Sequence, residues 1–153
     1  MGSYYFDTSA LVKHYRREAG TQVVERALAE AASTVVISRL CVVELVSAFA
    51  LHVRMGEISQ DDFAVARKRF FGDISSGLLL VANLKVAHFR QAERLIERHA
   101  TARRLRTLDA LQLSVAIDLF QSNRIDTLFT ADAALRDVAL LESVPTINPI
   151  TGV

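Results

Sequence analysis

The chain has 153 residues, of which 51% are hydrophobic and 23% charged, so its composition excludes a disordered or fibrous protein and favours one domain over residues 1–153. The 18 basic and 17 acidic residues nearly cancel, a balance that neither requires nor excludes a nucleic-acid partner. Cys41 is the single cysteine, which excludes an internal disulfide, and the sequence shows neither a signal peptide nor a membrane-length apolar run, so we expect a cytoplasmic protein with no membrane contact.

The first half of the chain predicts two strands and four helices. Short runs rich in β-branched and aromatic residues predict strands over residues 4–6 and 34–38. Helical periodicity and capping residues predict helices over 10–15, 21–32 and 40–55, and a fourth helix that begins at Ser59.

The second half predicts three strands and three helices. The continuous apolar run at 78–82 has the pattern of a strand buried on both faces, and strands are also expected at 127–130 and 144–147. Helices are expected over 85–100, from 106 or 107 to 121, and over 133–141. The alternation of strands with helices favours an α/β fold with a parallel sheet, in which ligands bind outside the carboxyl ends of the strands.

Two aspartates follow predicted strands. Asp7 comes directly after the strand at 4–6, and Asp132 comes just after the strand at 127–130. Each could simply cap the helix that follows, because aspartate is a favoured residue at that position. Thr8 and Ser9 offer the same capping chemistry, however, so capping alone does not account for an aspartate at position 7.

Two further acids lie on apolar helix faces. Glu44 shares its face with Leu40 and Leu51, where a carboxylate is costly unless it is paired or bound to a metal. Asp109 lies near the start of its helix, on the face of Leu113. A buried arginine partner would be an alternative explanation for Glu44, and the favourable end of the helix dipole would be one for Asp109.

Together the four acids fit one site better than four separate explanations do. Carboxylates held close together repel and raise one another's pKa, so such a cluster is expected to persist mainly with a divalent cation to neutralise it. Oxygen-only ligands select hard ions such as Mg²⁺ or Mn²⁺. Carboxylate-bound Mg²⁺ chiefly serves phosphoryl transfer and phosphodiester hydrolysis, so the cluster predicts that chemistry.

The segments around these acids resemble the four motifs of PIN-domain nucleases. In chain order they are YFDTSALVK (5–13), VEL (43–45), TLDALQL (107–113) and LFTAD (128–132). Their order and spacing are similar to those of the family, and the resemblance spans essentially the whole chain. The size of the chain and the absence of added domains look like VapC, the toxin ribonuclease of VapBC toxin–antitoxin pairs.

The resemblance implies a three-layer α/β/α fold with a central parallel sheet of about five strands. It also implies an endoribonuclease that uses one or two Mg²⁺ or Mn²⁺ ions, an RNA substrate, a VapB-like antitoxin laid across the active-site groove, and a homodimer. The family's acidic positions, which bind metal and carry out catalysis, fall on Asp7, Glu44, Asp109 and Asp132, with Thr130 or Thr8 at the hydroxyl position beside them.

An RNA substrate would require positive charge around an acidic centre. Arg103, Arg104 and Arg106 are the preferred candidates, because they come just before Asp109 in the sequence. Lys13, in the first motif, is a further candidate. Contacts of this kind bind phosphates and carry no sequence information.

Two other enzyme classes with an aspartate near the first strand fit the sequence less well. A haloacid-dehalogenase-type phosphatase needs a second aspartate two positions after the first, where this chain has Ser9. A phosphorelay receiver needs a phosphoacceptor aspartate after its third strand, and here Asn83 follows the run at 78–82. A PIN-fold RNA-processing or DNA nuclease outside a toxin–antitoxin system stays open, as does a non-catalytic module that binds RNA or protein.

Overall fold

The computed structural model describes residues 2–30 and 32–153. Within these residues, five strands and seven helices follow one another along the chain. They are β1 (Ser3–Phe6), α1 (Thr8–Tyr15), α2 (Thr21–Ala29), β2 (Thr34–Ser38), α3 (Arg39–Arg54), α4 (Gln60–Ser75), β3 (Leu79–Ala82), α5 (Val86–His99), α6 (Thr107–Gln121), β4 (Thr127–Phe129), α7 (Ala133–Leu141) and β5 (Thr146–Ile147). None of the helices in the described part of the chain is both long and apolar enough to span a membrane.

The strands form one parallel sheet in the order β3-β2-β1-β4-β5. β1 lies in the middle, with β2 on one side and β4 on the other, so the chain builds one half of the sheet and then the other. In parallel sheets with this kind of reversal, a crevice opens outside the carboxyl ends of the central strands. That edge is therefore where a functional site is expected.

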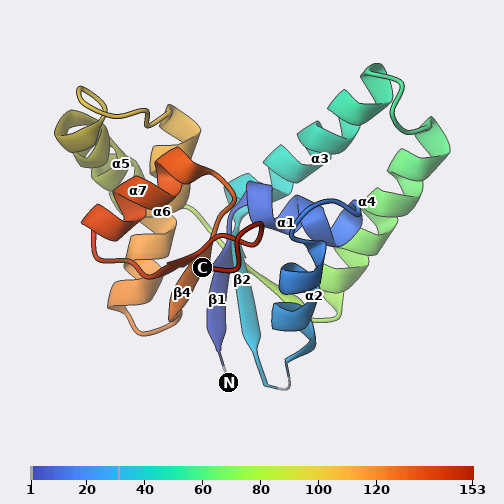
Figure 1. Cartoon of the computed structure of the whole chain (residues 1–153), viewed down its shortest axis with the longest axis horizontal. Coiled ribbons are helices and arrows are strands. Elements are labelled where there is room, and N and C mark those ends of the chain that lie inside the picture. The colour runs from blue at the N-terminus through green and yellow to red at the C-terminus, as the bar shows by residue number, and fades with distance from the viewer. Residues whose placement is uncertain (1, 31) are drawn as a thin grey trace.

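Helices cover both faces of the sheet, which confirms the predicted three-layer α/β/α fold (Figure 1). Successive side chains of a strand point to opposite faces. Tyr5 and Leu128 pack with α5, α6 and α7, whereas Phe6 and Phe129 pack with α1, α2, α3 and α4. The alternation in β1 and β4 thus divides the interior into two hydrophobic cores.

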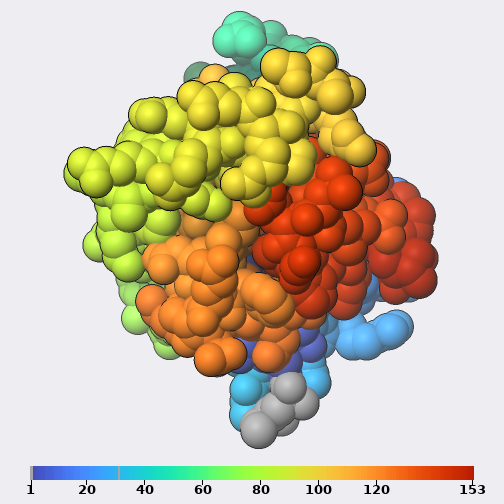
Figure 2. Space-filling model, turned by 90° about the vertical axis from the view of Figure 1, so that its left-hand side faces the viewer, coloured from blue at the N-terminus to red at the C-terminus, as the bar shows by residue number. Residues whose placement is uncertain are grey.

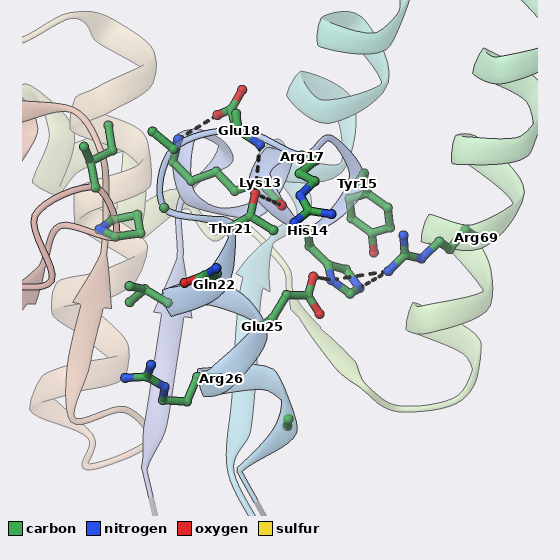
Figure 3. Close-up of a pocket in the computed structure, with 16 residues that line it drawn as sticks. Lys13, His14, Tyr15, Arg17, Glu18, Thr21, Gln22, Glu25, Arg26 and Arg69 are labelled. Carbon is green, nitrogen blue, oxygen red and sulfur yellow. Dashed lines mark hydrogen bonds and ion pairs between the residues drawn. The ribbon is translucent and has the colours of Figure 1, made fainter.

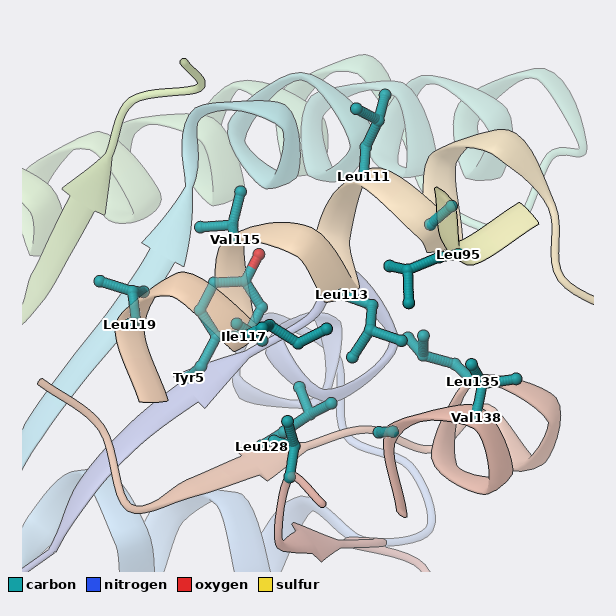
Figure 4. Close-up of a cluster of buried hydrophobic side chains, with 14 of the residues drawn as sticks. Tyr5, Leu95, Leu111, Leu113, Val115, Ile117, Leu119, Leu128, Leu135 and Val138 are labelled. Atoms are coloured by element: carbon teal, nitrogen blue, oxygen red, sulfur yellow. The ribbon is translucent and has the colours of Figure 1, made fainter. Parts of the chain in front are cut away.

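Helix α6 lies at the centre of the first of these cores. Every residue from 110 to 117 is buried, so the helix is enclosed almost all round. Figure 4 shows Leu113 and Ile117 of this helix among Tyr5, Leu128 and Leu135 from neighbouring elements. A helix enclosed in this way presents its polar side chains to other protein groups, which matters for the site below.

The structure corrects some details of the prediction. β3 lies at the edge of the sheet, and Leu80 is 44% exposed, so the prediction of a strand buried on both faces was wrong. An edge strand has a neighbour on one side only, and its outer part stays partly open to solvent. The final strand is confined to Thr146–Ile147, and α2 ends at Ala29; the predicted extension to 32 includes Ala31, which lies outside the described residues.

Candidate active site

A cleft of about 190 Å³ contains all four of the predicted acids. They come from separate elements: Asp7 and Asp132 are the residues that cap α1 and α7, Glu44 lies on α3, and Asp109 lies in the first turn of α6. The two caps stand just beyond the carboxyl ends of β1 and β4, which are neighbours in the sheet. The residues lining the cleft are Asp7, Thr8, Ser9, Glu44, Arg106, Asp109, Gln112 and Asp132.

Asp7 is held by three hydrogen bonds and is only 4% exposed. Its Oδ1 accepts from the Ala10 backbone N–H at 2.9 Å and from the Ser9 hydroxyl at 2.7 Å. Its Oδ2 accepts from the Thr130 hydroxyl at 2.6 Å. Asp7 therefore does cap a helix, and the same contacts fix both of its oxygens at the end of the sheet.

Thr130 joins the two aspartates at the strand ends. Its hydroxyl donates to Asp7 and accepts from the backbone N–H of Asp132 at 3.1 Å. Ser9 makes a parallel link, because its hydroxyl donates to Asp7 and accepts from the Ala131 backbone N–H at 2.9 Å. Of the two predicted hydroxyls, Thr130 contacts Asp7, whereas Thr8 lies 3.4 Å from the side-chain amide of Gln112. The role of Ser9 was not predicted.

The hydrogen-bond partner of Glu44 is the side-chain amide of Gln112, not the buried arginine that the sequence left open as an alternative. The Gln112 side-chain N–H₂ donates to Glu44 Oε1 at 2.6 Å and lies 3.4 Å from the Thr8 hydroxyl. The Gln112 carbonyl oxygen accepts from the Tyr5 hydroxyl and from the Ser38 hydroxyl, the latter at 3.0 Å. All the polar atoms of this buried glutamine are engaged, so Gln112 fixes the orientation of Glu44 from beneath the cleft.

The pKa of two of the acids is raised, and the main cause differs from the one expected. Burial raises the pKa of Asp7 to about 6, although its hydrogen bonds favour the charged form, and repulsion from Asp132 adds less. Burial also raises the pKa of Glu44, again with a smaller contribution from Asp109. Removal from water therefore outweighs the mutual repulsion of the carboxylates, which the sequence analysis had taken as the cause.

Arg106 bridges the other two acids. Its Nε donates to Asp109 Oδ2 at 3.0 Å, and its Nη2 donates to Asp132 Oδ2 at 3.4 Å. Asp132 is in turn anchored through Oδ1, which accepts from the backbone N–H groups of Ala134 and Leu135. One cation from the chain itself thus connects the starts of α6 and α7.

The cleft suits a hard divalent cation by the chemistry of its donors, since its acidic ligands are all carboxylates. As the side chains stand, no group of three or more His, Cys, Asp or Glu residues within 2–30 and 32–153 is arranged to hold a metal ion. The Arg106 guanidinium lies between Asp109 and Asp132, where a shared ion would need their oxygens. The donors of the cleft are therefore of the kind that a hard cation prefers, and two of them are engaged by this guanidinium.

The basic residues named from the sequence do not all gather at this cleft. Arg106 lines it, and Arg103 and Arg104 are exposed in the segment just before α6. Lys13 is buried, is ion-paired with Glu18 at 2.6 Å, and lines a different and larger groove of about 1150 Å³ along α1 and α2 (Figure 3).

Helix α5 forms part of the outer surface on the α6 and α7 side (Figure 2). Three arginines recur every four residues along it, Arg90, Arg94 and Arg98, and all three are exposed. Arg98 is ion-paired with Glu142 at 2.6 Å, and Arg94 donates to Gln91. Two of these side chains therefore already have partners in the protein.

Gln112 is the residue of the site that the sequence analysis missed. It falls within the third motif, but the resemblance gives it no role. A signal was present, because Gln112 is a polar residue within an apolar stretch, three positions after Asp109, and so lies on nearly the same helix face. Ser38 and Tyr5 were missed with it, since their role depends on a contact with Gln112 across the fold.

A five-stranded parallel sheet between two helical layers, with an acidic cleft where its central strands end, defines the class of α/β/α proteins to which this chain belongs. More particularly, the chain belongs to the PIN domain family, whose match extends over residues 4–141. This finding confirms the resemblance drawn from the four motifs.

Solved structures share the fold at low sequence identity. VapC20 of Mycobacterium tuberculosis, described as a sarcin–ricin loop cleaving toxin, has a TM-score of 0.64 and 18% identity over 88% of this chain and 93% of its own. VapBC2 of Rickettsia felis, bound to a promoter DNA fragment, has a TM-score of 0.67 and 16% identity, and the match covers 95% of this chain and 98% of that one. FitAcB of Neisseria gonorrhoeae has a TM-score of 0.62 and 20% identity, and the match covers 95% of this chain and 97% of that one. A comparison with curated proteins found no match.

Proposed function

We propose that this protein is a Mg²⁺- or Mn²⁺-dependent endoribonuclease, and that it acts in the cytoplasm as the toxin of a VapBC-type pair. The observation that carries the proposal is the convergence of four carboxylates from four separate elements on one cleft at the carboxyl end of the sheet. Membership of the PIN domain family supports it. The description of VapC20 as a toxin that cleaves the sarcin–ricin loop supports RNA as the substrate class.

Each acid has a role in the proposed reaction. Asp7, Asp109 and Asp132 would hold the cation, directly or through water. Gln112 engages Glu44 at Oε1, so we assign Glu44 Oε2 to orient the attacking water and accept its proton, or to hold a second ion. When bound, the cation would lower the pKa of a water molecule and offset negative charge on the phosphodiester.

The polar residues around the acids would keep them in place during the reaction. Thr130 and Ser9 hold Asp7, and Gln112 holds Glu44, through the hydrogen bonds described above. Arg103 and Arg104 would add phosphate contacts close to the cleft. Such contacts supply affinity without base recognition, so the choice of cleavage site must come from elsewhere in the RNA or the protein.

The nuclease proposal is tested by incubating the purified protein with structured RNAs in Mg²⁺, Mn²⁺ or EDTA. Wild type should cut with either metal and not with EDTA, and Asp7→Asn should be slower by more than about 100-fold, because ligand loss should cost more than the 10–100-fold typical of an outer contact. Asp61→Asn is the matched control, since it is the same substitution at an exposed position of α4. Cutting that survives both EDTA and Asp7→Asn would refute the proposal.

The toxin role has its own test. The VapBC2 structure and a toxin–antitoxin complex from Klebsiella pneumoniae share this fold, which supports a small antitoxin as the partner. Expression of the wild type should arrest growth, Asp7→Asn should not, and co-expression of a small DNA-binding protein encoded beside the gene should restore growth. Arrest that persists in Asp7→Asn would separate toxicity from nuclease activity. Sedimentation equilibrium would test the proposed homodimer.

A further inference from the structure

Arg106 occupies the acidic cleft in a way that the proposed function does not explain. It lies three residues before Asp109 and donates to Asp109 and to Asp132, which belong to different helices. Its hydrogen bond to Asp109 raises the pKa of the guanidinium, so it stays charged. The positive charge of Arg106 thus offsets the negative charges of two proposed metal ligands, as a bound metal ion would.

The arginine is the movable member of this group. Its side chain is 60% exposed, against 15% for Asp109 and 25% for Asp132. Asp132 Oδ1 accepts from two backbone N–H groups at the start of α7, and Asp109 Oδ2 accepts from the Arg106 backbone N–H at 3.3 Å at the start of α6. Exposed ion pairs of this kind contribute little stability, so movement of the guanidinium should cost little, while the Arg106 backbone keeps its place at the start of α6.

Arg106 contacts two of the four carboxylates of the cleft. The described residues include no three acidic or other ligating side chains arranged for a metal, although four carboxylates line one cleft. Asp109 and Asp132 each direct one oxygen, Oδ2, toward the guanidinium. Those two oxygens are then engaged by an internal cation and are not available to an external one.

We propose that Arg106 and a divalent cation compete for Asp109 and Asp132. In the metal-free protein the guanidinium neutralises this pair, and metal binding requires it to move out toward solvent. The inference rests on the proposed function, because it assumes that these carboxylates are metal ligands. It makes Arg106 a residue that sets the metal concentration at which the site fills.

Mn²⁺ affinity measured by calorimetry tests the competition directly. Arg106→Gln removes the internal cation, and we expect it to bind Mn²⁺ about fivefold more tightly, the factor that corresponds to losing a weak competing ion pair. Arg104→Gln is the matched control, because it removes the same charge from the same exposed segment. Affinity in Arg106→Gln that is equal to or weaker than in Arg104→Gln would overturn the proposal. Melting temperatures of each variant would show that it is folded.

A second measurement follows Mg²⁺ binding in the wild type and uses a variant only to assign one signal. The Arg106 side-chain Nε–H signal in a ¹H–¹⁵N spectrum, identified by its loss in Arg106→Lys, should shift as diamagnetic Mg²⁺ is added, because its bond to Asp109 breaks. The Arg104 signal should stay in place. An Arg106 signal that is unchanged when the site is saturated with Mg²⁺ would overturn the proposal.

The outcomes separate this inference from the nuclease proposal. If Mg²⁺ shifts the Arg106 signal and Arg106→Gln binds Mn²⁺ more tightly than Arg104→Gln, but RNA is not cut, the nuclease proposal fails and the competition stands. If RNA is cut with Mn²⁺ but Arg106→Gln binds the metal no more tightly than Arg104→Gln, the competition fails alone. If Mn²⁺ binds neither the wild type nor Arg106→Gln, both fail.

Discussion

Asp7 accepts hydrogen bonds from Ser9, Ala10 and Thr130 at a position almost closed to solvent. Its oxygens are therefore well placed for a ligand while its charge is poorly hydrated. Burial raises its pKa to about 6 from an ordinary value of 3.8, so the folded protein takes up a proton there that the unfolded chain takes up only at lower pH. The protonated form is favoured in the folded state, and stability should fall as pH rises through 6.

We expect metal-free wild type to lose about 1.5 kcal/mol of unfolding free energy between pH 5 and pH 8 through Asp7 alone. Asp7→Asn, which does not ionise, should lack that part of the pH dependence. Urea unfolding in EDTA at several pH values measures the difference, with Asp61→Asn as the control. Parallel stability curves for wild type and Asp7→Asn would contradict the burial of a charged Asp7.

Gln112 provides the second prediction at this scale. Gln112→Leu leaves the buried hydroxyls of Tyr5 and Ser38 without their shared acceptor, so we expect a loss of about 2 kcal/mol in stability. It also releases Glu44, and kcat for RNA should fall about tenfold, as for other residues that orient a ligand. Gln121→Leu, the same change at the exposed end of α6, should do neither. Equal effects of the two variants would refute the role of Gln112.

The sequence predicts the acids of the site more readily than their partners. Asp7 and Asp132 follow strands, and Glu44 and Asp109 lie on apolar helix faces, so their positions in the local pattern are informative. A hydrogen-bond partner on another element depends on the packing of both elements. Gln112 and the bridging role of Arg106 therefore became evident only in the folded chain.

At the scale of elements, the functional side chains cluster at the starts of helices. Asp7 and Asp132 are caps, Asp109 lies in a first turn, and Ser38 caps α3 while donating to Gln112. The alternation of strands and helices in the sequence was enough to predict these elements and the parallel sheet. The edge position of β3 was not predictable, because an apolar run does not reveal which strands will lie beside it.

Helix α6 carries both Asp109 and Gln112 on a body that is enclosed in the core, so its packing should control how firmly the site is held. Leu113→Ala, at a fully buried position, should cost about 3 kcal/mol of unfolding free energy, because it leaves a cavity. Val65→Ala, at a position on α4 that is 69% exposed, should change it by less than about 0.5 kcal/mol. Chemical denaturation measures the unfolding free energy of both variants. Similar losses in the two would contradict a central role of α6 in stabilising the fold.

At the scale of the whole molecule, the proposed metal should act as a stabilising ligand. Mn²⁺ at about 100 times its dissociation constant should add about 2.7 kcal/mol, or roughly 5–10 °C in Tm for a chain of this size. Asp7→Asn should show a smaller rise. Thermal unfolding with and without Mn²⁺ measures both, and equal Tm values for wild type in the two conditions, with binding shown by calorimetry, would argue against charged ligands that the metal neutralises.

The hydrogen bond between Asp7 and Thr130 joins positions 123 residues apart, and β1 has β4 as one of its two neighbours in the sheet. Asp7 is synthesised early, but Asp132, which also lines the cleft, follows only after β4. Contacts between such distant segments form late in folding, since they require a large loop to close.

A nascent chain should therefore have an incomplete cleft until both β4 and α7 have emerged from the ribosome. Ribosome-bound chains that stop before β4 should stay sensitive to protease, and chains in which α7 has emerged should be protected. Protection that appears before β4 emerges would contradict this. The order of the strands would thus delay assembly of the cleft until both halves of the sheet have been synthesised.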